Sequence, residues 1–591
     1  MAINSRRDDE DLEESLKIDV LRRLFGYLLS YKKQIVIVTS LIIITVAIGI
    51  LFPLLVQYII DVPILNRDIK MLVIMVAVVL VFALINMICN MIWRKIMANV
   101  SNDVVLKIRR ELYVHIQGLG VDFFDSRPAG KILARVTGDV NSLKDVLSST
   151  ITQLIPEAIT VVAVFIVMLT VSPLLTFSAV TAIPIIIVGV FFCEILAHKR
   201  WQLMRKKESN MTAFIHEDIA GIGIIQSFSA QEEATTEFND IVDEHKEAFR
   251  KAVQVADIFS PTIEISFGVG SFTLYYLAIK VMKLDVASVG TLTAFAMYMG
   301  MFFGPIRNLA NYYNKLITNI SAAERIFEIM DTPATVQNVQ GAQPMPPLEG
   351  TVCFDHVAFA YPDEPEKLIL TDVCFEVNKG ETIALVGPTG AGKTTIVSLI
   401  SRFYNTSSGT VYIDGMDISQ VEISSLRDQL GIMTQDNYLF SGTIKDNIKY
   451  GKPDATDDEI ISAAKAVHAH DFIMKLEKGY ETEISERGGG LSIGERQLIA
   501  FARTLMQDPK ILILDEATSN IDTRTELLVQ QGIEELLKKR TSFVVAHRLS
   551  TIRNADKIFV IDDGGIQECG THDELMEKRG AYYNLAMMRT K

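Results

Sequence analysis

The sequence is poor in cysteine and tryptophan and has no excess of positive charge. Its 591 residues include five cysteines and two tryptophans, and the formal net charge is −14. The cysteines are scattered without a C-x-x-C pair, which argues against a zinc framework or a disulfide scaffold and is typical of a reducing compartment. The excess of acidic over basic residues argues against a nucleic-acid partner. Residues 1–14 are polar and acidic and show no cleavable signal peptide.

Long apolar segments are confined to the first 330 residues. Six of them are long enough to cross a bilayer as helices, and Pro53 is expected to kink the first. We therefore predict a polar tail at residues 1–14 and a six-span helical membrane domain at residues 15–330. The predicted spans are residues 35–60, 71–93, 151–170, 174–196, 261–282 and 286–305.

The distribution of Lys and Arg predicts the orientation of these spans. Cations cluster in the two long connections, between spans two and three and between spans four and five, whereas the other connections carry few. The positive-inside rule then places both long connections and both termini in the cytoplasm, with the spans in the cell membrane. The long connections have a helical pattern, so we expect the spans to continue far below the bilayer. Residues 16–31 predict either an amphipathic helix at the membrane surface or an ordinary packed helix.

Polar and aromatic residues within the spans allow two interpretations. Glu157 and Glu264 would contact a cationic substrate or an ion, or they lie near a span end or hydrogen-bond a neighbouring helix. Aromatic residues and methionines form an adaptable surface for varied hydrophobic compounds, or they face lipid and pack between helices. This set comprises Phe267, Phe272, Tyr275, Tyr276, Met297, Tyr298, Met301, Phe302 and Phe303.

Residues 331–350 separate the membrane half from a soluble half. The segment holds four prolines, two glycines and few bulky apolar residues, so it predicts a linker. Residues 351–591 have the pattern of a cytoplasmic α/β domain. Its predicted strands are a pair at 351–355 and 357–361, followed by 373–377, 382–386, 411–415, 511–514 and 542–546.

A glycine-rich phosphate loop follows the strand at 382–386. It has the G-x-x-x-x-G-K-[ST] spacing between a buried strand and a helix, so its backbone N–H groups are expected to cradle phosphate oxygens. Lys393 would reach the β- and γ-phosphates of ATP, and Thr394 would offer its hydroxyl to Mg²⁺. The alternative is a chance match in a glycine-rich turn. The loop consists of Gly387, Pro388, Thr389, Gly390, Ala391, Gly392, Lys393, Thr394 and Thr395.

Two acids and a histidine follow other strands of this domain. Asp515 and Glu516 come after four aliphatic residues, which suits a buried parallel strand that delivers acids at its C-terminal end. Asp515 would bind Mg²⁺, and Glu516 would polarise an attacking water as a general base. His547 follows the strand at 542–546 and is either a γ-phosphate sensor or a packing residue.

Residues 491–497, Leu-Ser-Ile-Gly-Glu-Arg-Gln, precede a helical pattern at 498–506. A Ser-x-Gly turn at a helix N-terminus can bind an anion through backbone amides. This segment resembles the signature of the ATPase domain of ABC transporters, and the other motifs occur in that family's order. They are the phosphate loop, Gln435, the signature, Asp515-Glu516, residues 519–522 and His547.

The whole chain resembles the exporter type of that family, a membrane α-helical six-span domain followed by a cytoplasmic α/β P-loop ATPase domain. Residues 123–130 resemble the first coupling helix, and residues 211–222 sit where the second would be. The resemblance implies a half-transporter. The working unit would contain two such chains, with ATP held between the phosphate loop of one and the signature of the other.

The resemblance also implies roles for individual residues. By position in the family pattern, Tyr361 would stack on adenine and Gln435 would join the Mg²⁺ shell. Ser492 and Gly494 would contact the γ-phosphate bound to the partner chain. Asp522 would lie at the interface between the two ATPase domains.

The signature departs from the family's Leu-Ser-Gly-Gly-Gln at two positions. Ile493 replaces a glycine, and Glu495 places a carboxylate beside a triphosphate, where like charges repel. Because the phosphate loop, Asp515, Glu516 and His547 are intact, the sequence favours an asymmetric heterodimer. A different chain would then supply a sound signature. A homodimer that tolerates both substitutions is the alternative.

The sequence as a whole predicts a subunit of an ATP-driven exporter of hydrophobic or amphipathic compounds, of the multidrug type. One alternative is a homodimeric exporter of lipids or peptides. Another is an ABC protein that uses ATP to gate a response without pumping. A soluble ABC ATPase of DNA repair is disfavoured by the six spans.

Overall fold

The computed structural model describes residues 18–281, 289–434, 437–485, 488–515, 523–545 and 552–589. The chain forms two compact units. The first comprises Met1–His115 and Ile132–Asp331, and the second comprises Ile116–Lys131 and Thr332–Lys591. The second unit therefore contains the ATPase half together with a short piece of the membrane half.

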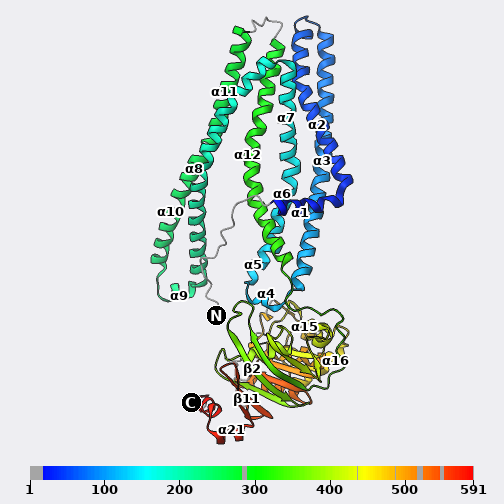
Figure 1. Cartoon of the computed structure of the whole chain (residues 1–591), viewed down its shortest axis with the longest axis vertical. Coiled ribbons are helices and arrows are strands. Elements are labelled where there is room, and N and C mark those ends of the chain that lie inside the picture. The colour runs from blue at the N-terminus through cyan, green and yellow to red at the C-terminus, as the bar shows by residue number, and fades with distance from the viewer. Residues whose placement is uncertain are drawn as a thin grey trace. The chain divides into compact units, whose positions relative to one another are not determined.

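The described residues of the first unit are helical (Figure 1). Helices α3, α8 and α12 have 49, 48 and 43 residues, about twice the length that crosses a bilayer. Such lengths agree with the predicted extension of the spans. The helices are α1 Ile18–Leu28, α2 Lys32–Ile59, α3 Ile69–Gln117, α5 Ala129–Ala134, α6 Val140–Ser149, α7 Ile155–Val171, α8 Pro173–Ala220, α9 Ile222–Ser227, α10 Gln231–Ala256, α11 Phe259–Tyr276 and α12 Val289–Asp331.

Five helical segments among the described residues are long and apolar enough to cross a membrane. They are Asp19–Ile64, Ile69–Gln117, Ala129–Val171, Gln231–Lys280 and Val289–Ile306. A shorter apolar helix, Pro173–Gly189, overlaps the predicted fourth span at 174–196. The count of six spans therefore stays a prediction.

Capping and packing define these helices. Ser172 separates α7 from α8, because its Oγ accepts the backbone N–H of Leu175 at 3.4 Å and Pro173 starts the new helix. Helix α8 packs along α10 and α11, and α12 packs against α2, α6 and α7 (Figure 1). The buried hydroxyl of Tyr298 on α12 donates to the carbonyl of Ile50 at 2.7 Å, which satisfies it inside an apolar core.

The second unit contains two main β-sheets (Figure 1). The six-stranded sheet has the order β12-β11-β3-β10-β9-β6, in which only β12 is antiparallel to its neighbour. The four-stranded sheet, β2-β1-β4-β5, is antiparallel, and β7 pairs with β8. The strands are β1 Val352–Ala360, β2 Leu368–Val377, β3 Thr382–Val386, β4 Ser408–Ile413, β5 Met416–Asp417, β6 Leu430–Met433, β7 Gly442–Thr443, β8 Glu483–Ile484, β9 Ile511–Asp515, β10 Thr541–Val545, β11 Lys557–Asp562 and β12 Gly565–Gly570.

Helices of the second unit flank these sheets, and α15, α16, α18 and α19 share one apolar core with β9 and β10. The helices are α4 Val121–Asp125, α13 Lys393–Ile400, α14 Ile423–Arg427, α15 Ile444–Lys449, α16 Asp457–Ala466, α17 His470–Ile473, α18 Ile493–Gln507, α19 Thr523–Leu537, α21 His572–Lys578 and α22 Ala581–Arg589.

Strand β3 is confirmed at its predicted bounds, whereas the predicted strand pair at 351–355 and 357–361 is wrong. Both segments belong to the single strand β1, which contains a bulge. The pairing with β2 shifts between Phe354 and Val357, and His356 has a φ of 49°. The bulge leaves two successive side chains, Asp355 and His356, exposed to solvent and so imitates a turn in the sequence pattern.

The predicted linker at 331–350 is hydrogen-bonded to the second unit. The guanidinium of Arg402, which is 2% exposed, donates to the carbonyl of Gln337 at 3.1 Å. Further along, the backbone N–H of Met345 donates to Ser425 Oγ at 2.7 Å.

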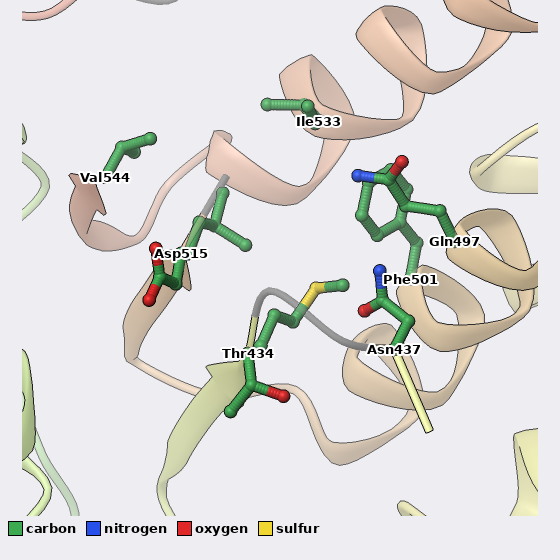
Figure 2. A pocket seen from close by; sticks show the side chains of 9 residues that line it. Thr434, Asn437, Gln497, Phe501, Asp515, Ile533 and Val544 are labelled. Carbon is green, nitrogen blue, oxygen red and sulfur yellow. The ribbon is translucent and has the colours of Figure 1, made fainter. Parts of the chain in front are cut away.

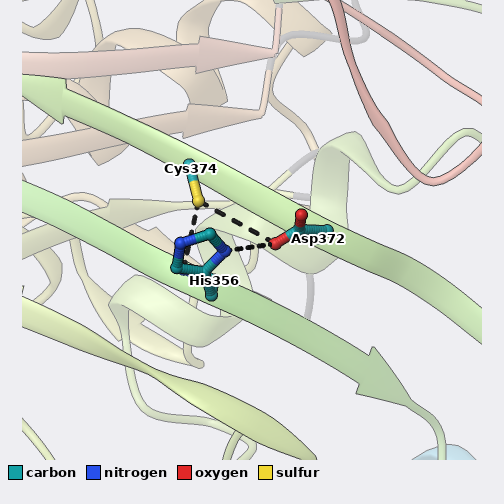
Figure 3. A group of neighbouring side chains, drawn as sticks. All are labelled: His356, Asp372 and Cys374. Carbon is teal, nitrogen blue, oxygen red and sulfur yellow. Dashed lines mark hydrogen bonds and ion pairs between the residues drawn. The ribbon is translucent and has the colours of Figure 1, made fainter.

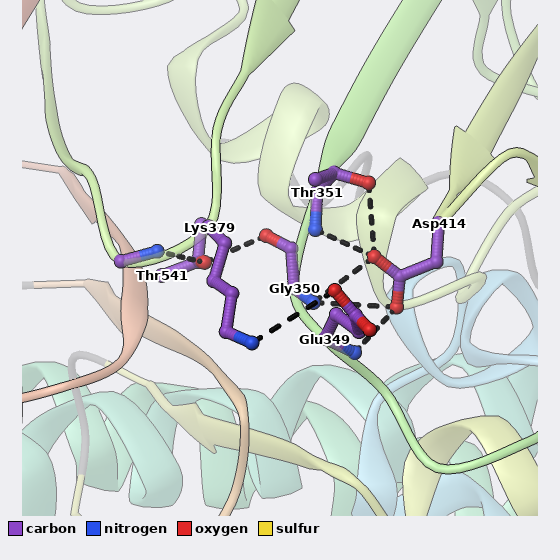
Figure 4. Close-up of polar contacts among 7 residues, drawn as sticks. Glu349, Gly350, Thr351, Lys379, Asp414 and Thr541 are labelled. Carbon is purple, nitrogen blue, oxygen red and sulfur yellow. Dashed lines mark hydrogen bonds and ion pairs between the residues drawn. The ribbon is translucent and has the colours of Figure 1, made fainter.

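The end of the linker is fixed by one carboxylate (Figure 4). Asp414 accepts the backbone N–H groups of Glu349 at 2.7 Å, Gly350 at 3.0 Å and Thr351 at 2.7 Å. Thr541 Oγ1 donates to the carbonyl of Gly350 at 2.6 Å, which ties the same residue to β10. The segment is therefore bound to the ATPase fold by hydrogen bonds.

Candidate functional site

Three parallel strands bring the predicted motifs to one edge of the six-stranded sheet. Strand β10 lies between β3 and β9, and its last residue, Val545, pairs with Leu385 of β3 and Asp515 of β9. The phosphate loop begins directly after β3. Ligands of open α/β sheets bind beyond the carboxyl ends of the strands, and this edge is such a place.

The phosphate loop has a backbone that only glycine permits. Gly387, Gly390 and Gly392 have φ values of 155°, 86° and 100°. A Cβ on Gly387 would lie 2.1 Å from the carbonyl oxygen of Ile561, and one on Gly392 would lie 2.7 Å from Leu370 Cδ2. The loop therefore presents its backbone without side chains in the way.

Lys393 begins α13 at the end of this loop and is 8% exposed. Its Nζ donates to the carbonyls of Gly387 at 3.1 Å and Pro388 at 2.7 Å, so the ammonium lies inside the curve of the loop. The remaining predicted residues divide by exposure: Pro388, Thr389, Gly390 and Thr394 are exposed, whereas Ala391 and Thr395 are buried beneath the loop.

Tyr361 follows β1 and contacts the phosphate loop. Its hydroxyl lies 3.1 Å from Thr395 Oγ1, the last loop residue. Its ring packs edge-on against Tyr404, with ring centroids 5.3 Å apart, and against Phe359 at 5.0 Å. The structure thus brings the residue predicted to stack on adenine to the predicted phosphate-binding loop.

A small cavity lies where three motifs meet (Figure 2). Thr434, which precedes Gln435, lines it together with Asp515 and with Gln497, the last residue of the signature. Gln497 is 5% exposed, and among the described residues its Oε1 has no hydrogen-bond partner. Because a buried unpaired amide oxygen costs about 1–3 kcal/mol, we expect a bound water here. Sequence reasoning assigned no role to Gln497.

Four predicted residues lie outside the described residues: Gln435, Glu516, Asp522 and His547. Their roles stay predictions. Glu516 directly follows Asp515, the last residue of β9, and His547 follows the last residue of β10 by two positions.

The signature forms the N-terminus of α18. Ser492 is the N-cap: its Oγ accepts the N–H of Glu495 at 3.3 Å, and the Glu495 carboxylate accepts the N–H of Ser492 at 2.8 Å. This reciprocal pair is a capping box. The helix begins at Ile493, whose side chain is 45% exposed and whose φ is not positive, while Gly494 is buried. The position of Ile493 therefore does not require glycine within this chain.

Helix α4, which overlaps the predicted first coupling segment at 123–130, belongs to the same unit as the ATPase sheets. Tyr404 donates its hydroxyl to Asp125 Oδ2 at 2.5 Å, and Thr335 donates to Asp122 Oδ1 at 2.7 Å. Burial, and then the hydrogen bond to Asp125, hold the pKa of Tyr404 well above its usual value, so the phenol stays a donor. A contact path therefore runs from Tyr361 through Tyr404 to α4.

The residues at this edge fit a nucleoside triphosphate and a hard cation. The side-chain-free curve of the loop and the enclosed ammonium of Lys393 suit phosphate oxygens. The hydroxyl of Thr394 and the carboxylate of Asp515 are oxygen donors of the kind that Mg²⁺ prefers.

Some of the polar and aromatic residues singled out in the membrane half contact neighbouring helices, and others are exposed. Asn308 on α12 donates to Glu157 Oε1 at 2.8 Å, which is a hydrogen bond to a neighbouring helix, whereas Glu264 is exposed on α11. Tyr298 and Phe302 are buried and pack between helices, but Phe272 is 72% exposed on the single chain.

Two family models match the chain. One, described as the ABC transporter transmembrane region, matches residues 35–306. The other, described as ABC transporter, matches residues 370–519, which include the phosphate loop, the signature and Asp515.

Several relatives match the chain over most of its length. The uncharacterized ABC transporter ATP-binding protein YknV of Bacillus subtilis (strain 168) is 38% identical over 98% of this chain and 96% of its own length. A putative multidrug export ATP-binding/permease protein of Staphylococcus aureus (strain NCTC 8325 / PS 47) is 37% identical over 96% and 99%. A fatty acid ABC transporter ATP-binding/permease protein of Mycobacterium tuberculosis (strain CDC 1551 / Oshkosh) is 38% identical over 84% and 77%.

A solved structure agrees with these matches. That of a bacterial Atm1-family ABC exporter with ATP bound gives a TM-score of 0.79 at 26% sequence identity and covers 95% of this chain and 98% of its own. The chain belongs to the ABC transporter family, as a half-transporter whose transmembrane domain is fused to an ATP-hydrolysing domain.

Proposed function

We propose that this chain is one half of an exporter that moves hydrophobic or amphipathic compounds out of the cytoplasm across the cell membrane. The ATPase domain and both termini lie in the cytoplasm. The observation that carries the proposal is the contact path from the phosphate loop through Tyr361 and Tyr404 to Asp125 of α4. It gives the nucleotide edge a physical connection to a segment of the membrane half. Relatives named for putative multidrug export and for fatty acid transport support this choice of compounds.

In this proposal each predicted residue at the carboxyl edge of the six-stranded sheet has one role. Tyr361 stacks on adenine, the backbone of the phosphate loop and Lys393 bind phosphates, and Glu516 takes the proton of the attacking water. Thr394, Gln435 and Asp515 would hold Mg²⁺, which supplies positive charge against the phosphate oxygens when bound. His547 contacts the γ-phosphate.

We further propose that the second half is a different chain. In this chain, the carboxylate of Glu495 occupies the helix N-terminus where a γ-phosphate would bind, and it accepts the N–H of Ser492 at 2.8 Å. A partner with an intact signature would then complete the site formed by this chain's phosphate loop and Glu516.

A pair of identical chains is the second candidate, and the same capping box favours it. A capping box contributes to the stability of α18 in any assembly, so Glu495 has a structural role that does not depend on a partner. Ile493 also fits its helical position without strain.

Transport assays test the export proposal. The chain is co-purified with the products of adjacent genes, reconstituted into vesicles with the ATPase outside, and supplied with a fluorescent lipophilic cation or a fluorescent fatty acid. We expect uptake against the gradient that requires ATP and Mg²⁺. ATP hydrolysis without accumulation of either probe would favour a regulatory protein that does not pump.

The same vesicles test the composition of the dimer. The purified chain alone is expected to hydrolyse ATP slowly and without stimulation by the transported probe. Vigorous, transport-coupled hydrolysis by this chain alone would contradict a different partner and leave the export proposal standing.

Tyr404→Phe is expected to weaken coupling. The variant keeps the ring against Tyr361 but removes the hydrogen bond to Asp125. A hydrogen bond to a charged group contributes about 1.5–3 kcal/mol, so transport per ATP hydrolysed should fall by about 10- to 100-fold. Tyr412→Phe on β4 is the control, because its hydroxyl makes no hydrogen bond among the described residues. An unchanged ratio in Tyr404→Phe would remove this contact from the coupling path.

A further inference from the structure

The outer face of the four-stranded sheet carries a group of metal-ligating side chains (Figure 3). His356 extends from β1, and Asp372 and Cys374 extend from β2. One ligand atom from each lies within 4.8 Å of the other two. All three residues are exposed, with the side chains of His356 and Asp372 at 73% and 66%. A dissolved ion therefore has open access to them.

The bulge in β1 creates this group. A regular strand would alternate its side chains, so that Asp355 and His356 would point to opposite faces of the sheet. Instead the left-handed φ of 49° at His356 turns its imidazole onto the solvent face. The backbone N–H of His356 points at Cys374 Sγ, 3.2 Å away, and the imidazole Nδ1 lies 2.8 Å from Asp372 Oδ1.

The two ligands on β2 are placed by strand geometry. Asp372 and Cys374 are two residues apart, so both side chains stand on the same face, and Sγ lies 3.9 Å from Oδ1. Three ligand atoms are thus held together by paired backbones and need little ordering to bind an ion.

The donor set selects the type of ion. Thiolate, imidazole and carboxylate together are ligands of zinc, whereas Mg²⁺ and Ca²⁺ prefer sets made of oxygen alone. Three protein ligands leave the fourth tetrahedral position to water, as in exchangeable sites. Two further carboxylates, Asp355 on β1 and Glu376 on β2, add negative charge on the strands around Cys353 and favour a cation.

We propose that His356, Asp372 and Cys374 form a binding site for one zinc-class divalent ion on the outer face of the β1–β2 pair. The ion takes the place of the hydrogen between Nδ1 and Oδ1: the imidazole binds in its neutral form with its hydrogen on Nε2, and the thiol proton passes to solvent. The ion joins the two strands directly before Tyr361.

Cobalt is the probe for this site. The full chain, with any histidine tag removed and a phosphine reductant present, is titrated with CoCl₂ in detergent and followed by absorption. We expect one equivalent of Co²⁺ per chain, with a thiolate-to-cobalt charge-transfer band and the intense visible bands of tetrahedral Co²⁺. One equivalent of ZnCl₂ should abolish both. Absence of a thiolate band would overturn the proposal.

Single substitutions identify the ligands. Cys374→Ser is expected to abolish the charge-transfer band, and Asp372→Asn and His356→Gln to weaken Co²⁺ binding at least tenfold. Cys569→Ser, at another exposed cysteine on β12, is the matched control and should bind as the unaltered chain does. Zn²⁺ should raise the Tm of the unaltered chain and of Cys569→Ser but not of Cys374→Ser. A band that survives Cys374→Ser, or is lost only in Cys353→Ser, would overturn the assignment.

Discussion

Glu516→Gln is expected to lower ATP turnover by about 10²–10⁴-fold while ATP binding is retained, because the variant loses only the group that accepts the proton of the attacking water. Glutamine has nearly the same size as glutamate and does not act as a base at neutral pH. The bound nucleotide should therefore accumulate uncleaved, with the two ATPase domains closed around it.

The measurement combines steady-state hydrolysis with retention of labelled ATP on the complex. Glu534→Gln, at an exposed position of α19, is the matched control and should turn over normally. The assignment of Glu516 rests on its place directly after Asp515 at the loop edge of the sheet. Near-normal hydrolysis by Glu516→Gln would contradict it and would direct the search to other acids beyond β9 and β10.

Lys393→Met is expected to weaken ATP binding by about 10- to 100-fold, because a hydrogen bond to a charged group contributes about 1.5–3 kcal/mol. Methionine keeps the unbranched stem of the buried side chain but removes the ammonium. Hydrolysis should fall at least as far, since the same ammonium is proposed to bind the phosphates that react.

Lys393 also holds its own loop, so stability must be measured alongside binding. Its Nζ donates to the carbonyls of Gly387 and Pro388, which lose that donor in the variant. Thermal unfolding without nucleotide separates this loss from the loss of ATP binding, which is measured by calorimetry. Lys367→Met, at an exposed position before β2, should change neither quantity. Unaltered ATP affinity in a folded Lys393→Met chain would exclude the proposed role.

Sequence patterns located the elements whose signals are local. The apolar run at 382–386 is strand β3 at the predicted bounds, and the glycines of the phosphate loop have the positive φ values that the motif requires. Both depend on residues that are neighbours in the chain. The bulge at His356 has no comparable signal, because two successive polar residues in an alternating pattern indicate a turn as readily as a bulge.

Contacts between distant segments were beyond the reach of these patterns. Tyr404 and Asp125 are 279 positions apart, and neither carries a motif that names the other. The cluster of His356 with Cys374 is hidden for the same reason, because its ligands come from two strands and show no spacing typical of a zinc site. The scattered positions of the cysteines argue against a zinc site whose ligands are close together in the sequence. They do not argue against a site whose ligands come from neighbouring strands of a sheet.

The segment between α12 and β1 has a mechanical consequence. Its first anchor is Thr335, only four residues after α12 ends at Asp331, and its last is the carboxylate of Asp414. Three residues, 332–334, separate that first anchor from the end of α12. From Thr335 onward the segment is bound to its own unit, so it moves as part of the ATPase unit and does not act as a flexible tether between two domains.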